Sequence, residues 1–112
     1  MAKIECELYG NFDEILADLH STVLHNSSSA SCEDSSDFYI GDTRCAVRAY
    51  ERYSYLGKGR VSMNITLLQS VGTIFISIIY TVVSSAVFFK MNTIGENNFL
   101  DTVRYTVNKY KR

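Results

Sequence analysis

The chain has 112 residues, of which 46% are hydrophobic and 21% charged, and its formal net charge is −1 at neutral pH. This length and composition predict a single globular domain, residues 1–112, with one core, and the near-zero charge gives no electrostatic basis for binding nucleic acid. The three cysteines, Cys6, Cys32 and Cys45, are odd in number and far apart, which favours free thiols in a reducing compartment over disulfides or a zinc site. Because the N-terminus has no apolar signal segment, we expect a cytoplasmic protein.

The first two elements follow from clear periodicities. From Lys3 to Tyr9, apolar and charged residues alternate, which predicts a strand with one wet face. A capping box at Asn11–Glu14 then predicts the start of a helix that runs to about Leu24. One stripe of this helix is apolar and should face the core: Phe12, Ile15, Leu16, Leu19 and Val23.

The next part of the chain is more polar. We expect a short strand from Ser28 to Glu33 and a polar loop from Asp34 to Asp42, followed by a long strand from Arg44 to Tyr55.

The stretch from Val61 to Phe89 contains no ionisable group except the phenol of Tyr80. It could be a single membrane span through Val71–Phe89 or the centre of a buried sheet. Its residues are mostly β-branched, and its first part alternates apolar and polar side chains, so the pattern favours the sheet.

The register of the strands predicts which side chains share the apolar face of the sheet. A loop between Tyr55 and Val61 places Tyr53 opposite Met63 and Glu51 opposite Ile65, on the apolar face. A turn at Ser70-Val71 then sets the next strand, with Ile78 beside Met63, and a turn at Ser84-Ser85 adds a last strand. That strand would bring Val87, Phe89 and Met91 to the same face.

A second capping box, Thr93 to Glu96, predicts a final helix through about Lys109. The predicted order is β-α-β-β-β-β-β-α, a two-layer α+β domain with about six antiparallel strands and two helices on one face. This order resembles the helix-grip folds, in which an antiparallel sheet wraps a long C-terminal helix.

Three segments carry a closer resemblance: 10–14 (GNFDE), 44–55 (RCAVRAYERYSY) and 86–96 (AVFFKMNTIGE). They resemble a family of short bacterial proteins whose function is uncharacterised. The resemblance implies no catalytic residues and no cofactor.

The apolar face could line a pocket for a small apolar ligand between the sheet and the C-terminal helix. A carboxylate desolvated there, that of Glu51, would have a raised pKa and could act as an acid or base. Alternatively, sheet curvature turns Glu51 to the rim and the aromatic residues are simply core. The candidate ligand-binding residues are Glu51, Tyr53, Tyr55, Tyr80, Phe89, Phe99 and Val103.

Nothing in the sequence predicts catalysis or a metal site. His20 and His25 are five residues apart and so do not share a helical face, and no nucleophile with a recognisable base is present. We therefore expect a non-catalytic domain without a cofactor.

The opposite face of the predicted sheet has too many large apolar groups to be freely solvated. It also includes tyrosine and arginine, which are common in interfaces. We therefore predict a homodimer through this face, although a different protein, or the Asp34–Asp42 loop, could cover it instead. The candidate interface residues are Arg48, Tyr50, Arg52, Leu68, Phe75, Ile79 and Phe88.

Overall fold

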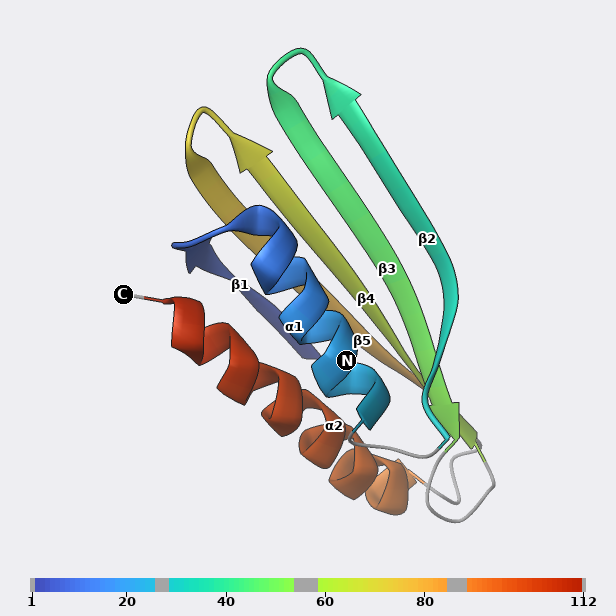
Figure 1. The fold of residues 1–112 in the computed structure, drawn as a ribbon. Coiled ribbons are helices and arrows are strands. Elements are labelled where there is room, and N and C mark those ends of the chain that lie inside the picture. Colours follow the sequence, from blue (N-terminus) through green and yellow to red (C-terminus); the bar gives the residue numbers. More distant parts are fainter. Residues whose placement is uncertain (1, 26–28, 54–58, 85–88, 112) are drawn as a thin grey trace.

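A computed structural model describes residues 2–25, 29–53, 59–84 and 89–111 of the chain (Figure 1). These segments form five strands and two helices, in the order β-α-β-β-β-β-α. Their bounds are β1 Ala2–Leu8, α1 Phe12–His25, β2 Ser31–Ile40, β3 Thr43–Tyr53, β4 Gly59–Ser70, β5 Thr73–Ser84 and α2 Phe89–Tyr110.

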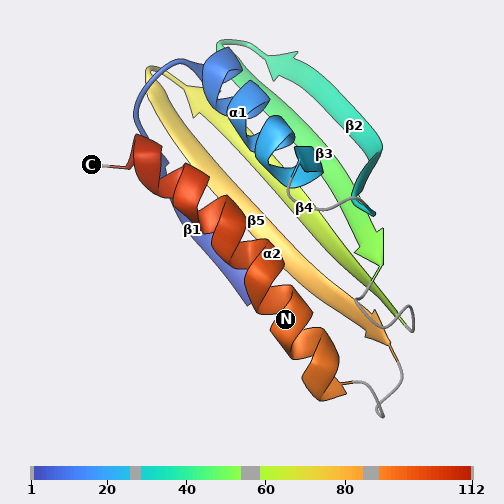
Figure 2. The same cartoon turned by 60° about the horizontal axis from the view of Figure 1, so that its bottom comes forward.

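The strands form one antiparallel sheet in the order β1-β5-β4-β3-β2. Both helices lie side by side on the same face of this sheet, so the molecule has two layers (Figures 1 and 2). We call the other side of the sheet, on which no described element packs, the open face. The predicted α+β class and the antiparallel sheet with two helices on one face are confirmed.

The sheet has five strands and not six, because α2 begins at Phe89. Phe89 and Met91 therefore belong to a helix, whereas Val87 lies outside the described residues. A short apolar run carries too few positions to distinguish a period of two from a helical period, which explains the error.

A second difference concerns the predicted loop Asp34–Asp42, most of which is strand β2. The chain turns at Gly41-Asp42, where Gly41 has a φ of 58°. A glycine at the first central position of a two-residue turn suits a hairpin. Since β2 pairs with β3 along its length, this segment is not a loop folded over the open face.

The stretch that suggested a membrane span forms β5 over Thr73–Ser84. Its pairing with β4 keeps the predicted faces but is displaced by two residues, so Met63 pairs with Tyr80 and Ile65 with Ile78. The displacement arises because the turn is Val71-Gly72 and not Ser70-Val71. No helix among the described residues is long and apolar enough to cross a membrane.

Strand β3 faces the opposite way from the prediction. Met63 pairs with Tyr50 and not with Tyr53, and a shift by an odd number of residues exchanges the two faces of a strand. Tyr50 and Ala46 are buried beneath the helices, whereas Tyr53 is exposed. Tyr50 can face inward because its hydroxyl is satisfied by a 2.8 Å hydrogen bond with Nδ1 of His20 in α1.

The core lies between the sheet and the helices. Helix α1 begins as predicted, since the backbone N–H of Glu14 donates to Oδ1 of Asn11 at 2.9 Å. Its apolar stripe and that of α2 pack on the inward rows of the strands. The buried members from the helices are Phe12, Ile15, Leu19, Val23, Leu100, Val103 and Val107.

Candidate functional site

The predicted ligand-binding residues do not converge on one pocket. Glu51 lies on the open face, where its Oε1 accepts a 3.2 Å bond from Nη1 of Arg60, and Tyr53 lies on that face too. Tyr80 and Val103, by contrast, are fully buried in the core. The inversion of β3 thus separates the polar groups that the sequence had placed together.

Three other predicted ligand-binding residues cannot be placed by their side chains. Tyr55 lies outside the described residues. Phe89 and Phe99 belong to α2, but only their backbone positions are described.

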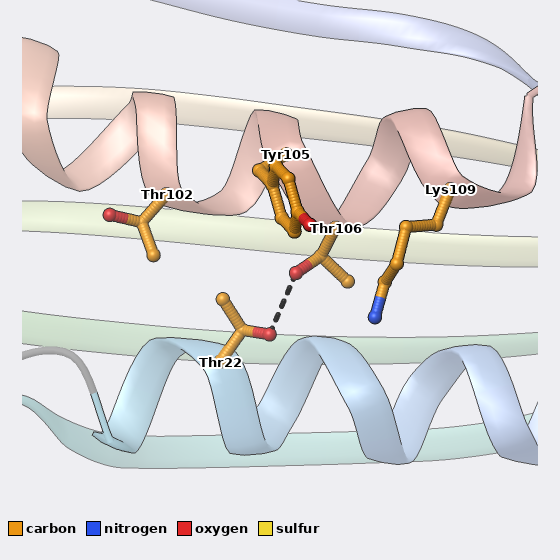
Figure 3. Close-up of a pocket in the computed structure, with 5 residues that line it drawn as sticks. All are labelled: Thr22, Thr102, Tyr105, Thr106 and Lys109. Atoms are coloured by element: carbon orange, nitrogen blue, oxygen red, sulfur yellow. Dashed lines mark hydrogen bonds between the residues drawn. The ribbon is translucent and has the colours of Figure 1, made fainter.

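A hollow of about 400 Å³ lies between the two helices, and not between helix and sheet (Figure 3). One residue of α1 and four of α2 line it: Thr22, Thr102, Tyr105, Thr106 and Lys109. Across the gap, the hydroxyls of Thr22 and Thr106 form a 2.8 Å hydrogen bond. This groove had no signal in the sequence, because threonines on helix faces are usually solvated.

An ion pair closes one end of this groove. Nζ of Lys109 and the hydroxyl of Tyr110 each lie 2.7 Å from Oδ2 of Asp18. The bond from Lys109 and then that from Tyr110 hold the pKa of Asp18 below its usual value. Burial, aided by the bond to Asp18, raises the pKa of Tyr110 to about 12. The cation is thus already matched by an anion, so the groove suits a small polar molecule better than an anionic one.

A second polar cluster lies beneath α1. His20 bonds Tyr50, and Cys32 stands directly opposite Tyr50 in the sheet. Burial raises the pKa of the Tyr50 phenol well above its usual value, so this hydroxyl keeps its proton and does not serve as a base. The thiol of Cys32 points to the carbonyl of Asp34, 3.6 Å away. The His20–Tyr50 bond joins β3 to α1, whereas the contact of Cys32 is within β2, and both suggest a structural role.

Metal-binding side chains are likewise dispersed. Within the described segments, no group of three or more His, Cys, Asp or Glu side chains is placed to hold a metal ion.

The predicted interface residues divide between the two faces of the sheet. Arg48, Tyr50 and Arg52 alternate with residues of the open face and point to the helix side, so their assignment to the outward face is wrong. Arg48 instead forms a 3.1 Å ion pair with Asp37 of β2. Phe88 lies outside the described residues.

Leu68, Phe75 and Ile79 do lie on the open face, as predicted. Leu68 and Phe75 stand opposite each other, and the same cross-strand row continues through Cys45 to Phe38 of β2. Val47 lies in the next row, and Ile79 lies beyond Ser77 on β5. We call these side chains of the open face the apolar patch: Phe38, Cys45, Val47, Leu68, Phe75 and Ile79.

Phe38 was not among the candidate interface residues, because the polar pattern of Asp34–Asp42 predicted a loop there. The available signal was Gly41-Asp42 between two segments rich in aromatic and β-branched residues, which is typical of a two-residue hairpin.

The chain is similar to a crystal structure of a Pseudomonas aeruginosa protein of unknown function, PA94, which has been proposed as a regulator. The two share 10% sequence identity with a TM-score of 0.41, over 87% of this chain and 78% of that one. No protein of curated function is significantly similar in sequence. A family model described as a family of unknown function, DUF6054, matches residues 1–111, and the chain therefore belongs to this family.

Proposed function

We propose that this protein is a small, non-catalytic domain of the bacterial cytoplasm that self-associates through the open face of its sheet. The observation that carries the proposal is the apolar patch. Three of its large side chains remain well exposed in the single chain, with exposed fractions of 39% for Phe75, 41% for Ile79 and 44% for Phe38. An exposed group of large apolar side chains of this kind is typical of an interaction site.

The size of the open face fits a dimer. Five strands spaced by about 4.8 Å, with about ten residues each rising about 3.4 Å, give a surface of roughly 820 Å² before side-chain relief is counted. A stable interface buries about 800 Å² on each partner. Two such faces would pack about 10 Å apart, as the sheets of a β-sandwich do.

Charge supports the same arrangement. Two ion pairs on the open face are already made within one chain, Lys3 with Glu5 at 3.5 Å and Arg60 with Glu51 at 3.2 Å. Covering the centre of the face therefore need not bury an unpaired charge from these residues. A two-fold axis through the patch would place it against itself, which is the commonest symmetry of soluble assemblies.

The proposed cytoplasmic location is based on the cysteines. Cys6, Cys32 and Cys45 all belong to the described residues and are free thiols. Three unlinked thiols suit the reducing conditions of a cytoplasm.

Size-exclusion chromatography with light scattering at tens of micromolar tests the self-association. We expect a dimer for the wild type and a folded monomer for Phe75→Glu, because a carboxylate at the centre of the patch would be buried without a partner. Tyr105→Glu is the matched control, since Tyr105 is an exposed aromatic residue on the helix layer. A monomeric wild type, or a Phe75→Glu variant that remains dimeric, would contradict the proposal.

The groove between the helices carries a second candidate function, the binding of a small polar ligand. Its volume of about 400 Å³ lies within the range of small-molecule sites, and its lining includes three threonines, two of which bond each other. Binding should raise the melting temperature by mass action. A thermal-shift screen of neutral metabolites on the wild type and on Thr102→Val tests this function. Equal stabilisation of both proteins by the same compounds would exclude the groove as the binding site.

A further inference from the structure

Strand β2 is the edge of the sheet on the side away from α2 (Figure 2). Nearly all its side chains are exposed, on both faces of the sheet. In the part of the chain that the structure describes, β3 is the only strand that pairs with it. A long strand with one free edge can accept another strand by backbone hydrogen bonds.

The hairpin geometry identifies the groups at that edge. Ile40 and Thr43 flank the two-residue turn, so they form a hydrogen-bonded pair, as do Phe38 with Cys45 and Ser36 with Val47, before a register shift between Cys32 and Asp34 ends this alternation. The intervening residues, Ser35, Asp37 and Tyr39, direct their N–H and C=O groups outward. One contact agrees with this direction, because the N–H of Ser35 donates to the side chain of Asp34 at 2.8 Å, a bond that an incoming strand would replace.

Charge determines which strand could pair there. The segment from Ser31 to Asp42 contains four acidic residues and no basic one. Asp37 forms an ion pair with Arg48, but its side chain remains half exposed. The carboxylates of Glu33, Asp34 and Asp42 are exposed beside the edge, and an incoming basic strand would be attracted to them.

The same charges disfavour a second copy of β2. The antiparallel register centred on Asp37 would use all three outward-facing residues, but it would place Asp37 against its own symmetry mate. Like charges directly opposite each other destabilise a strand pair. The edge is therefore matched to a different sequence.

We propose that the outer edge of β2 is a docking strand for an extended, basic segment of a partner protein, which adds to the sheet as a further antiparallel strand. Lysine or arginine would lie opposite Glu33 and Asp34. Apolar residues would lie opposite the exposed end of the strand, Phe38 to Ile40. The backbone supplies the affinity, and the acidic and apolar ends of β2 fix the direction of the segment.

A fluorescent eight-residue peptide with valines in its first half and lysines in its second half is the probe, read by fluorescence anisotropy. We expect saturable binding that weakens as salt is raised, because the lysines interact with exposed carboxylates. The control peptides have the same sequence with N-methyl groups on the residues that face β2, or with glutamates in place of lysines. Each should bind at least tenfold more weakly.

Two protein variants locate the site. Ser35→Pro removes an outward N–H while leaving the bonds to β3 in place, and should weaken binding at least tenfold. Ser35→Ala retains that N–H and should bind as the wild type does. If Ser35→Pro fails to fold, as judged by circular dichroism, the N-methyl comparison decides alone.

Three results would overturn the proposal: no binding of the lysine peptide at millimolar concentration, equal binding of the N-methyl peptide, or full binding by a folded Ser35→Pro. The test is independent of self-association, since the same titration on Phe75→Glu should give unchanged affinity whether or not the wild type is a dimer.

Discussion

Val71 occupies a backbone conformation that suits its side chain poorly. It has a φ of 50°, and Gly72 follows with a φ of 81°, the signature of a turn with positive φ at both central positions. A β-branched residue is strained there, whereas asparagine is tolerated. The Val71 side chain is 88% exposed, so its replacement loses little packing.

We therefore expect Val71→Asn to raise the free energy of unfolding by about 1 kcal/mol, measured by urea denaturation at one fixed protein concentration. Gly72→Ala is the opposite control and should destabilise the fold, because its positive φ favours glycine. A Val71→Asn variant no more stable than the wild type would show that the turn is not strained.

Arg44 joins α1 to the β2–β3 hairpin. Its guanidinium carbon lies 4.1 Å from the centroid of the Phe12 ring and 5.7 Å from that of Tyr39. Its Nη2 also donates to Oδ1 of Asp13 at 2.7 Å, and this bond holds the pKa of the Asp13 carboxyl below its usual value.

Arg44→Ala should lower the free energy of unfolding by about 1 kcal/mol, mainly through the lost cation–π contact with the buried ring of Phe12. Arg60→Ala is the matched control, since its ion pair lies on the open face, and it should cost less than about 0.5 kcal/mol. Equal losses in urea denaturation would show that the rings contribute nothing beyond the charge pair.

At the scale of elements, the contact between the two helices depends on pH. Asp18 of α1 accepts bonds from Lys109 and Tyr110 of α2, which lower its pKa. A carboxyl whose pKa is lower in the folded state contributes stability above its unfolded pKa, about 3.9, and that contribution is lost as the pH falls through the folded value.

On acidification below about pH 4, the wild type should therefore lose stability more steeply than Asp18→Asn. Asp101→Asn, which removes an exposed carboxylate of α2, should retain the steep wild-type profile. Thermal unfolding followed by circular dichroism across this pH range measures the difference. Parallel profiles for wild type and Asp18→Asn would contradict the assignment.

The elements differ in how far their sequence determines them. The inward residues of β4 and β5 are nearly all apolar, among them Met63, Ile65, Ile76 and Ile78. The alternation predicts β4, and the β-branched composition predicts β5. Helix α1 follows in the same way from its stripe and its cap.

Strand β3 could not be oriented by hydrophobicity, because both of its rows mix polar and apolar residues. The inward row carries Arg44, Arg48 and Tyr50. The polar ends of Arg44 and Tyr50 bond residues of α1, and that of Arg48 bonds Asp37 of β2. Such long side chains can pack their carbon atoms inward while their polar ends form hydrogen bonds or ion pairs. Those partners lie in other elements of the chain. The local sequence pattern therefore could not predict the orientation of β3, or the candidate pocket around Glu51 that depends on it.

For the molecule as a whole, the topology suggests an order of folding. Two-residue turns link β2 to β3 and β4 to β5, whereas β1 joins β5 only after most of the chain has been placed. Contacts that close long loops cost more entropy and tend to form late.

Ile65 and Ile4 provide a matched test, since both are buried and both pair with Ile78, from opposite sides. Each change to alanine should cost about 2–5 kcal/mol. We expect Ile65→Ala mainly to slow folding and Ile4→Ala mainly to speed unfolding, measured by stopped-flow kinetics in the Phe75→Glu background. A higher φ-value for Ile4 than for Ile65 would show that β1 docks early.

The tip of the β2–β3 hairpin has a consequence for engineering and for evolution. It extends past the helices (Figure 1), and a Cβ placed on Gly41 would meet no atom within 4 Å. Extra residues added there displace nothing from the core, and each doubling of a flexible loop costs only about 0.6 kcal/mol of closure entropy. The tip is thus a place where the gene can accept an inserted reporter or an additional domain, and where insertions among relatives would be least costly.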